Sequence, residues 1–228
     1  MKKVISFSLW GNNPTYTIGA IINAELAKIY YPDFECWFYI HQETVPEEII
    51  NELTQLRNTK VILKTGDLSV SRPMMWRFEA IDEPDVEIMM SRDTDTRFLL
   101  REKLAVQEWL ESGKTFHIMR DHPHHTFTIL GGMFGTRKIS NINSWKIIIN
   151  NINQASSRDY DQTFLNQYIY PHINNDSLVH SSFTIHPGEN AKPFPIPYCK
   201  DYKFVGEYVY QDESRSKYHI DELIKNID

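Results

Sequence analysis

The chain has 228 residues, of which 41% are hydrophobic and 24% are charged, and its net charge is −6. This is the composition of a globular protein, and the length suits one domain with a sizeable core. The acidic balance gives no sign of nucleic-acid binding. No stretch approaches the roughly 18 apolar residues of a membrane span. We therefore expect a soluble protein.

Two further features bear on location. The only cysteines, Cys36 and Cys199, form neither a disulfide framework nor a CxxC motif, which fits a reducing compartment. The start, MKKVISFSLWGNN, has the charge and apolar run of a signal peptide, but the run is short and no small-residue cleavage site follows. A first buried strand explains it better. We expect a cytoplasmic protein, and peripheral association with a membrane stays open.

The first 110 residues predict alternating strands and helices. Apolar runs rich in β-branched and aromatic residues predict strands at Val4–Trp10, Phe34–Ile40, Lys60–Lys64 and Val86–Ser91. Between them, helical spacing or an opening proline predicts helices over Ile18–Ile29, Pro46–Leu56 and Met74–Ile81. This alternation indicates an α/β domain with a mostly parallel sheet. In such a sheet, ligands bind beyond the carboxyl ends of the strands.

After Leu110 the pattern is less regular. A strand is predicted at Lys114–Met119, helices in WKIIINNI and DQTFLNQYIY, and short strands with Pro-rich loops from Ser177 onward. The helix before that strand, which begins near Leu99, is predicted to expose Arg101, Glu102 and Lys103 to water. Residues 211–228 form a charged, helix-like tail.

Asp93 and Asp95 follow the fourth predicted strand, at one of these ligand-binding strand ends. Two carboxylates at i and i+2 can converge on Mg²⁺ or Mn²⁺, whose coordination substrate phosphates often complete. Arg92 and Arg97 flank the pair and could add phosphate contacts. Asp is also a frequent turn former, so two solvated turn carboxylates remain the alternative at this point.

Another polar cluster is RDHPHH, which contains Asp121, His122, His124 and His125. It can be a solvated loop, a wall of a sugar pocket, or a metal site, although the spacing is no standard zinc pattern. The following GGMFG contains Gly131 and Gly132, which would let backbone approach a ligand closely. A simple turn explains these glycines equally well.

Two later segments carry candidate side chains. Asp159, Asp161 and Gln162 stand at the start of a predicted helix. One of them could be only an N-cap, or a carboxylate there could bind sugar hydroxyls or assist catalysis. His186 and Lys192 lie in HPGENAKPFP, where they bind metal or phosphate, or belong to a Pro-rich surface loop. No GxSxG or cysteine–histidine signature supports a hydrolase nucleophile.

The run RDTDTRFLLREKLAVQEWLESGKTFHIMRDHPHHTFTILGGMFG resembles a family of small GT-A-type glycosyltransferases. Bacterial surface-polysaccharide enzymes belong to this family, as does, more distantly, the amino-terminal domain of a chlorella-virus capsid glycosyltransferase. The segments MMWRF, YDQTFLNQYIYP and PFP…YKFVGEYV match as well. Together these motifs are far more specific than DxD alone.

The resemblance implies a nucleotide-sugar donor, UDP-linked, with Mn²⁺ or Mg²⁺ on the DxD sequence Asp93-Thr94-Asp95. Arg77 would contact the donor. The loop after the first strand, comprising Leu9, Trp10 and Gly11, would meet the nucleoside.

Two partial matches point to a retaining family of glycogenin and lipopolysaccharide galactosyltransferases. DQTFLN is similar to its DQDxLN, with Thr163 in place of the second Asp. HPGENAKP is similar to its HxxGxxKP, with the His-to-Gly spacing one residue short. These departures leave open both His186 as a metal ligand and a retaining mechanism.

We therefore expect a single GT-A-like, Rossmann-like domain with a mixed, mostly parallel sheet flanked by helices. Residues 1–110 would form the nucleotide-sugar half of the domain and residues 111–210 the acceptor half. The expected function is metal-dependent transfer of a sugar to a glycan or other hydroxyl, as in polysaccharide biosynthesis. Asp161, Gln162 and Asp121 are the candidate catalytic residues.

Two alternatives remain. One is a binding module that holds nucleotide sugar or glycan without turnover. The other is a haloacid-dehalogenase-like phosphatase with Asp93 as nucleophile, although Arg97 stands where that motif has Thr or Val.

Overall fold

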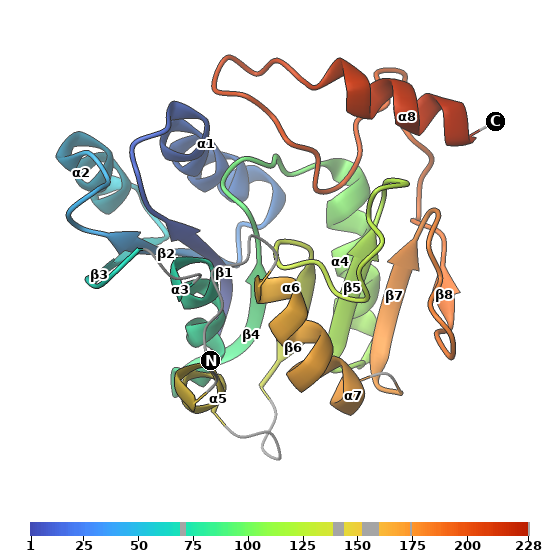
Figure 1. Ribbon diagram of the computed structural model, residues 1–228, viewed down its shortest axis with the longest axis horizontal. Helices are drawn as coiled ribbons and strands as arrows, with labels where there is room; N and C mark the ends of the chain where they lie inside the picture. The colour runs from blue at the N-terminus through green and yellow to red at the C-terminus, as the bar shows by residue number, and fades with distance from the viewer. Residues whose placement is uncertain (69–71, 139–143, 152–159, 174, 228) are drawn as a thin grey trace.

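The computed structural model describes residues 1–68, 72–138, 144–151, 160–173 and 175–227. Within them, eight strands form one sheet in the order β3-β2-β1-β4-β6-β5-β7-β8 (Figure 1). The strands are β1 (Lys2–Leu9), β2 (Glu35–His41), β3 (Thr59–Lys64), β4 (Val86–Ser91), β5 (Phe116–Arg120), β6 (Phe134–Arg137), β7 (Ser177–Ser181) and β8 (Ala191–Lys192). Asp159 lies outside the described residues.

The pairing makes the sheet mixed and mostly parallel, as predicted. β1 runs parallel to β2 on one side and to β4 on the other. β6 pairs antiparallel with both β4 and β5. The remaining pairs, β2 with β3, β5 with β7, and β7 with β8, are parallel.

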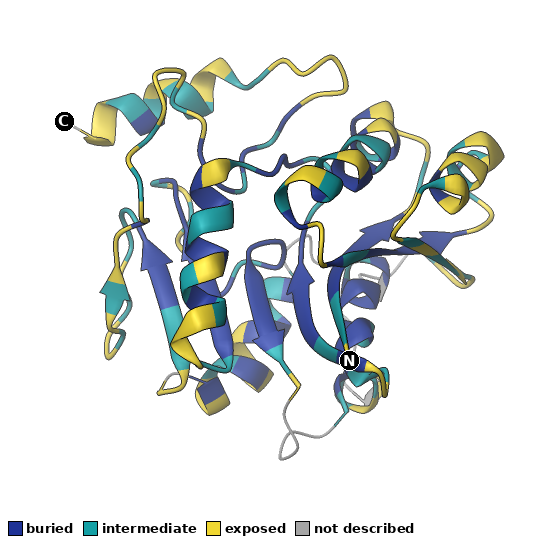
Figure 2. Ribbon diagram, turned by 180° about the vertical axis from the view of Figure 1, so that it is seen from behind, coloured by how far each residue is buried: buried dark blue, intermediate teal, exposed yellow. Residues whose placement is uncertain are grey.

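Helices cover both faces of the sheet (Figures 1 and 2). One face carries α1 (Pro14–Tyr30), α2 (Glu47–Gln55) and α4 (Leu100–Ser112). The other carries α3 (Arg72–Met75), the 3-10 helix η1 (Trp76–Asp82), α5 (Trp145–Asn151), α6 (Tyr160–Phe164), the π-helical turn η2 (Leu165–Ile169) and α7 (Tyr170–Ile173). The last helix, α8 (Lys217–Ile227), ends the described chain. No helix in the described ranges is long and apolar enough to cross a membrane.

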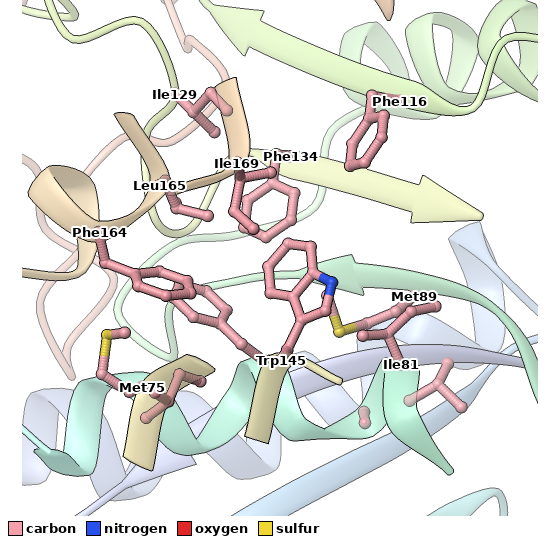
Figure 3. Packing of buried hydrophobic residues seen from close by; sticks show 14 of the residues in the cluster. Met75, Ile81, Met89, Phe116, Ile129, Phe134, Trp145, Phe164, Leu165 and Ile169 are labelled. Carbon is pink, nitrogen blue, oxygen red and sulfur yellow. The ribbon is translucent and has the colours of Figure 1, made fainter. Parts of the chain in front are cut away.

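Both faces of the central strands are apolar because each faces a layer of helices. On β2, Trp37 and Tyr39 join the core under α3, η1 and α5, whereas Phe38 and Ile40 join the core under α1 and α2. Figure 3 shows aromatic and aliphatic side chains of the first core in contact, with Trp145 of α5 beside Phe134 of β6. Continuous apolar runs were therefore the right signal for these strands.

Helix α4 differs from its prediction. Arg101 and Glu102 were expected to face water, and this is wrong, because their exposed fractions are 7% and 2%. Glu102 accepts a hydrogen bond from Arg92 at 2.7 Å. Arg101 donates two hydrogen bonds to the carboxylate of Asp121, at 2.8 and 2.9 Å. Each of these two buried charges therefore has a partner of opposite charge, without which its burial would be very costly.

Asp121 is fully buried. Besides Arg101, it accepts hydrogen bonds from Ser182, from the Tyr198 hydroxyl and from the amide of Val205. This placement argues against the predicted catalytic role of Asp121, because a buried carboxylate with all these donors cannot reach a substrate. Asp121 instead ties α4 and β5 to the segment that follows β8.

Replacing Asp121 by Ala should destabilise the fold by about 3–5 kcal/mol, since Arg101 would be left buried without its partner. Urea unfolding measures the loss. The matched control is Asp221→Ala, which removes an exposed pair with Lys217 and should cost about 0–1 kcal/mol. Equal unfolding midpoints for the two variants would contradict a structural role for Asp121.

Candidate functional site

The site lies where two parallel strands, β1 and β4, end side by side. Helix α1 leaves β1 over one face of the sheet, and the chain reaches β4 through α3 and η1 on the opposite face (Figures 1 and 2). From β1 the chain adds β2 and β3 on one side of β1 and then places β4 on its other side, and ligands bind at the carboxyl ends of strands where the strand order reverses in this way. A cavity of about 620 Å³ opens at this position, which is ample for a small-molecule ligand.

Many of the predicted site residues line this cavity. They are Leu9, Trp10, Gly11, Arg77, Asp93, Thr94, Asp95, Gly131, Gly132, Asp161 and Gln162. The structure thus brings the segment after β1, the DxD turn, the glycine pair and the start of α6 to one place. The functional roles assigned to these residues remain predictions.

Sequence reasoning missed other lining residues. They are Ser8, Asn12, Asn13, Tyr16, Met74, Leu130, Met133 and Gly206. Asn12 and Asn13 could have been found, because they directly follow β1 in the turn sequence GNNP. No local sequence pattern marks Gly206 as a lining residue, since the fold of the C-terminal segment alone brings it to the cavity.

Arg77 of η1 bridges two carboxylates of the cavity. One terminal nitrogen, Nη1, donates to Asp93 Oδ1, and the other, Nη2, donates to Asp161 Oδ2 at 2.7 Å. Arg77 is 5% exposed, so it is the cation that balances these two acids in a poorly solvated position. Asp93 keeps 43% of its side chain exposed, so the carboxylate still faces the cavity.

Two carboxyl groups of the cavity, Asp95 and Asp161, have raised pKa values. Burial, together with the charge of Asp93, raises the pKa of Asp95 to about 7. Burial also raises the pKa of Asp161, against the opposing effect of Arg77. The cavity lining contains three carboxylates and one arginine, so an added cation would relieve their mutual repulsion.

Gly131 and Gly132 let the main chain approach these acids closely. A Cβ on Gly132 would lie 1.9 Å from Asp93 Oδ2, and one on Gly131 would lie 2.1 Å from Asp161 Oδ2. Ser91, the last residue of β4, fixes this approach by donating to the Gly131 carbonyl at 2.6 Å. Glycine is therefore required at both positions for steric reasons.

Three basic residues expected at the ligand lie elsewhere. Arg92 is 2% exposed and donates to Glu102 and to the carbonyls of Ser91 and Phe134. Arg97 pairs with Glu213 at 2.8 Å. Lys192 pairs with Glu108. None of the three lines the cavity, so the phosphate contacts predicted for them find no support in this geometry.

His186 also lies outside the cavity lining. Its backbone amide donates to Glu189 at 3.0 Å, and Glu189 pairs with the buried Arg120. His186 therefore belongs to a turn tied to β5, and its predicted role at the metal or sugar finds no support here. Within the described chain, no group of three or more His, Cys, Asp and Glu side chains is placed to hold a metal ion.

Two histidines of RDHPHH, His122 and His124, contact the C-terminal helix, and none of the three lines the cavity. His122 Nε2 donates to the carbonyl of His219 on α8 at 2.9 Å, while its Nδ1 accepts from the amide of His124 at 3.1 Å. His125 Nδ1 accepts from the amide of Asp121 at 3.0 Å. This arrangement gives no support to the predicted sugar contacts of His122, His124 and His125. Because the Nδ1 atoms of His122 and His125 accept hydrogen bonds, both side chains are neutral imidazoles with a structural role.

Solved glycosyltransferase structures resemble this chain. A glycosyltransferase involved in glycosylation of the major capsid of PBCV-1 matches with a TM-score of 0.48 and 16% identity, over 78% of this chain and 81% of that one. The galactosyltransferase LgtC, in complex with donor and acceptor sugar analogs, matches with a TM-score of 0.47 and 14% identity, over 78% and 73%. An active-site mutant of LgtC gives 0.46 and 12%, over 89% and 92%.

No protein-family model matches the chain. No curated protein matches it in sequence. At the identities of the structural matches, a shared activity does not follow, so any function must come from the cavity itself.

Replacing Gly132 by Ala should disrupt the cavity without unfolding the protein, because the new Cβ would displace the Asp93 carboxylate. We expect at least tenfold weaker binding of any ligand that uses Asp93, measured by titration calorimetry. Gly188→Ala is the control, since it strains the backbone, at φ +84°, while no atom lies within 4 Å of the new Cβ. Unchanged binding in Gly132→Ala would contradict the close approach.

Acid should destabilise the packing of α8. Burial lowers the pKa of His122 and His219, and it lowers that of His125 to about 3. Unfolded histidine titrates near 6.5. The stabilisation from neutral imidazole is therefore full above about pH 6.5 and decreases as the pH falls toward the folded-state pKa values.

Urea midpoints measured between pH 8 and pH 5 check this dependence. The decrease should be smaller in His125→Gln and unchanged in His172→Gln, which alters an exposed histidine. A midpoint in His125→Gln that falls as steeply as in the wild type would rule out this account.

Proposed function

We propose that the protein is a metal-dependent glycosyltransferase that moves a sugar from a nucleotide-sugar donor, UDP-linked, to a hydroxyl of a glycan or other acceptor. One observation carries the proposal. Asp93 and Asp95 open into a cavity of about 620 Å³ at the junction of β1 and β4, next to the segment after β1. A dinucleotide or nucleotide sugar binds at such a junction in open α/β sheets.

The residues at the DxD turn fit a hard divalent cation. Carboxylate oxygens are the ligands that Mg²⁺ and Mn²⁺ prefer, and one or two carboxylates with substrate phosphates form the usual set. The cavity lining offers two such carboxylates at i and i+2, and the glycine at 132 leaves room for the Asp93 carboxylate. A cation held there would screen the donor diphosphate and favour its departure as UDP.

The other residues suggest a division of roles. Trp10 and Gly11 at the end of β1 would take the nucleoside, with Trp10 38% exposed at the cavity. Arg77 would orient Asp161, which would accept hydrogen bonds from hydroxyls of the donor sugar. Gln162 would add a further polar contact from α6.

Asp161 is the one carboxylate of the described cavity lining outside the DxD turn. In an inverting reaction, Asp161 would take the proton of the acceptor hydroxyl. A retaining reaction needs no protein base, and Asp161 would then serve only to orient the sugar. We also propose a cytoplasmic reaction, consistent with two free cysteines.

Titration calorimetry with UDP and Mn²⁺ tests the proposal. The wild type should bind with a dissociation constant of about 1 µM to 1 mM, the range usual for enzyme substrates. Asp95→Ala should weaken binding at least tenfold, because half of the carboxylate pair is lost. Asp33→Ala, which removes an exposed acid, is the control and should bind like the wild type.

The outcome also separates the alternatives. Slow release of UDP from a nucleotide sugar supports a transferase, whereas binding without release in any acceptor screen supports a binding module. Hydrolysis of an aryl phosphate that Asp93→Asn abolishes would support the phosphatase. Absence of UDP and GDP binding with Mn²⁺ present would overturn the proposed function.

A further inference from the structure

Every backbone carbonyl of the DxD turn has a hydrogen-bond donor. The Asp93 carbonyl accepts from the Thr96 hydroxyl at 3.0 Å. The Asp95 carbonyl accepts from the amide of Val209 at 2.8 Å. The carbonyls of Thr94 and Thr96 accept from two side chains each, as detailed below. The main chain of the turn is therefore held in place by directed hydrogen bonds.

Helix α1 supplies one of these side chains, Asn23. Its Nδ2 donates to the Thr94 carbonyl at 3.1 Å and to the Thr96 carbonyl at 2.8 Å. Both partners are carbonyls, so the amide nitrogen must face them. One turn earlier on the same face of α1, Gly19 lies so close that a Cβ would be 2.2 Å from the Thr94 carbonyl oxygen. The helix thus approaches the turn closely and bonds to it.

The C-terminal segment holds the same turn from the other side. Arg97 Nη1 donates to the carbonyls of Thr94 and Thr96 at 3.3 and 2.8 Å, and its guanidinium is held by Glu213. Val209 supplies the amide that meets the Asp95 carbonyl. Because Arg97 also satisfies the two carbonyls, removal of Asn23 would leave neither of them without a donor.

Asn23 is an unusual choice for stability alone. It is 1% exposed, and among the described residues no donor reaches its Oδ1. A buried amide oxygen without a partner costs about 1–3 kcal/mol. Leucine has the same branching and would remove that cost. The amide at position 23 is therefore better explained by its two donor hydrogens than by core packing.

We propose that Asn23 is a positioning residue for the metal-binding turn. It acts through the carbonyls of Thr94 and Thr96, and so holds Asp93 and Asp95 in the spacing that binds the cation and the donor diphosphate. This inference rests on the proposed function. Preorganisation of this kind improves affinity because the ordering cost is met before the ligand binds.

The test is Asn23→Leu, with binding of Mn²⁺ alone and of UDP with Mn²⁺ measured by calorimetry. We expect at least fivefold weaker binding of UDP with Mn²⁺ and an unfolding midpoint close to that of the wild type. Ala24→Gly is the matched control. It weakens α1 by about 1 kcal/mol without touching the turn, so it should lower the midpoint and leave affinity unchanged.

A second variant displaces the same turn while the amide of Asn23 stays in place. Gly19→Ala places a Cβ against the Thr94 carbonyl and should also weaken binding at least fivefold. Wild-type affinity in both Asn23→Leu and Gly19→Ala would overturn the inference while the proposed function stands. A wild-type protein that binds neither Mn²⁺ nor UDP would overturn both. Equal losses of affinity in Asn23→Leu and Ala24→Gly would show an effect of helix stability and would also overturn the inference.

Discussion

The bridge that Arg77 makes between Asp93 and Asp161 is the constraint around which the cavity is arranged. Three carboxylates share a partly buried space, and their repulsion must be offset for the fold to form. Arg77 offsets part of it with two directed hydrogen bonds. The remaining negative charge would favour a cationic ligand over an anionic one. A single buried guanidinium therefore offsets part of the charge of these acids and leaves a net negative charge in the cavity.

Buried arginines recur through the second half of the sheet with a different result. Arg92 meets Glu102, and Arg120 meets Glu189, in pairs whose side chains are all 3% exposed or less. Buried pairs of this kind add little net stability over apolar packing, but one partner alone is very costly. They therefore fix which elements pack together. Arg77 differs because one of its carboxylates, Asp93, faces open space.

The strands were predictable because most are buried on both faces and read as unbroken apolar runs. The same apolar pattern predicted that the DxD turn lies at the carboxyl end of a strand, since Asp93 comes two residues after the end of β4. The glycine pair was predictable as a close approach but not as an approach to Asp93 and Asp161. The close contact of Gly132 with Asp93 depends on the antiparallel strand β6, whose pairing with β4 no local pattern specifies.

The expectations that the structure does not support share one physical cause. Charged and histidine-rich segments were interpreted as solvated or ligand-binding, although a long-range partner decides the matter. Arg92 is buried against Glu102, 10 residues away, and Arg101 against Asp121, 20 residues away, and no periodic pattern specifies either pair. The role of Asn23 was not predictable, since a single Asn in a helix belongs to no recognisable motif. Its hydrogen-bond partners lie 71 and 73 residues away in the sequence. Local sequence reports periodicity and turn chemistry, but not these pairings.

The same long-range contacts make the C-terminal segment part of the cavity. Gly206 lines it, Gln211 accepts from Thr15 at the start of α1, and Glu213 holds Arg97 beneath the DxD turn. The segment continues into α8, where His219 meets His122. Packing of the tail and geometry of the turn are thus joined by one stretch of chain. The charged tail, residues 211–228, is connected to α1 through Gln211 and to Arg97 through Glu213, while Gly206, just before it, lines the cavity.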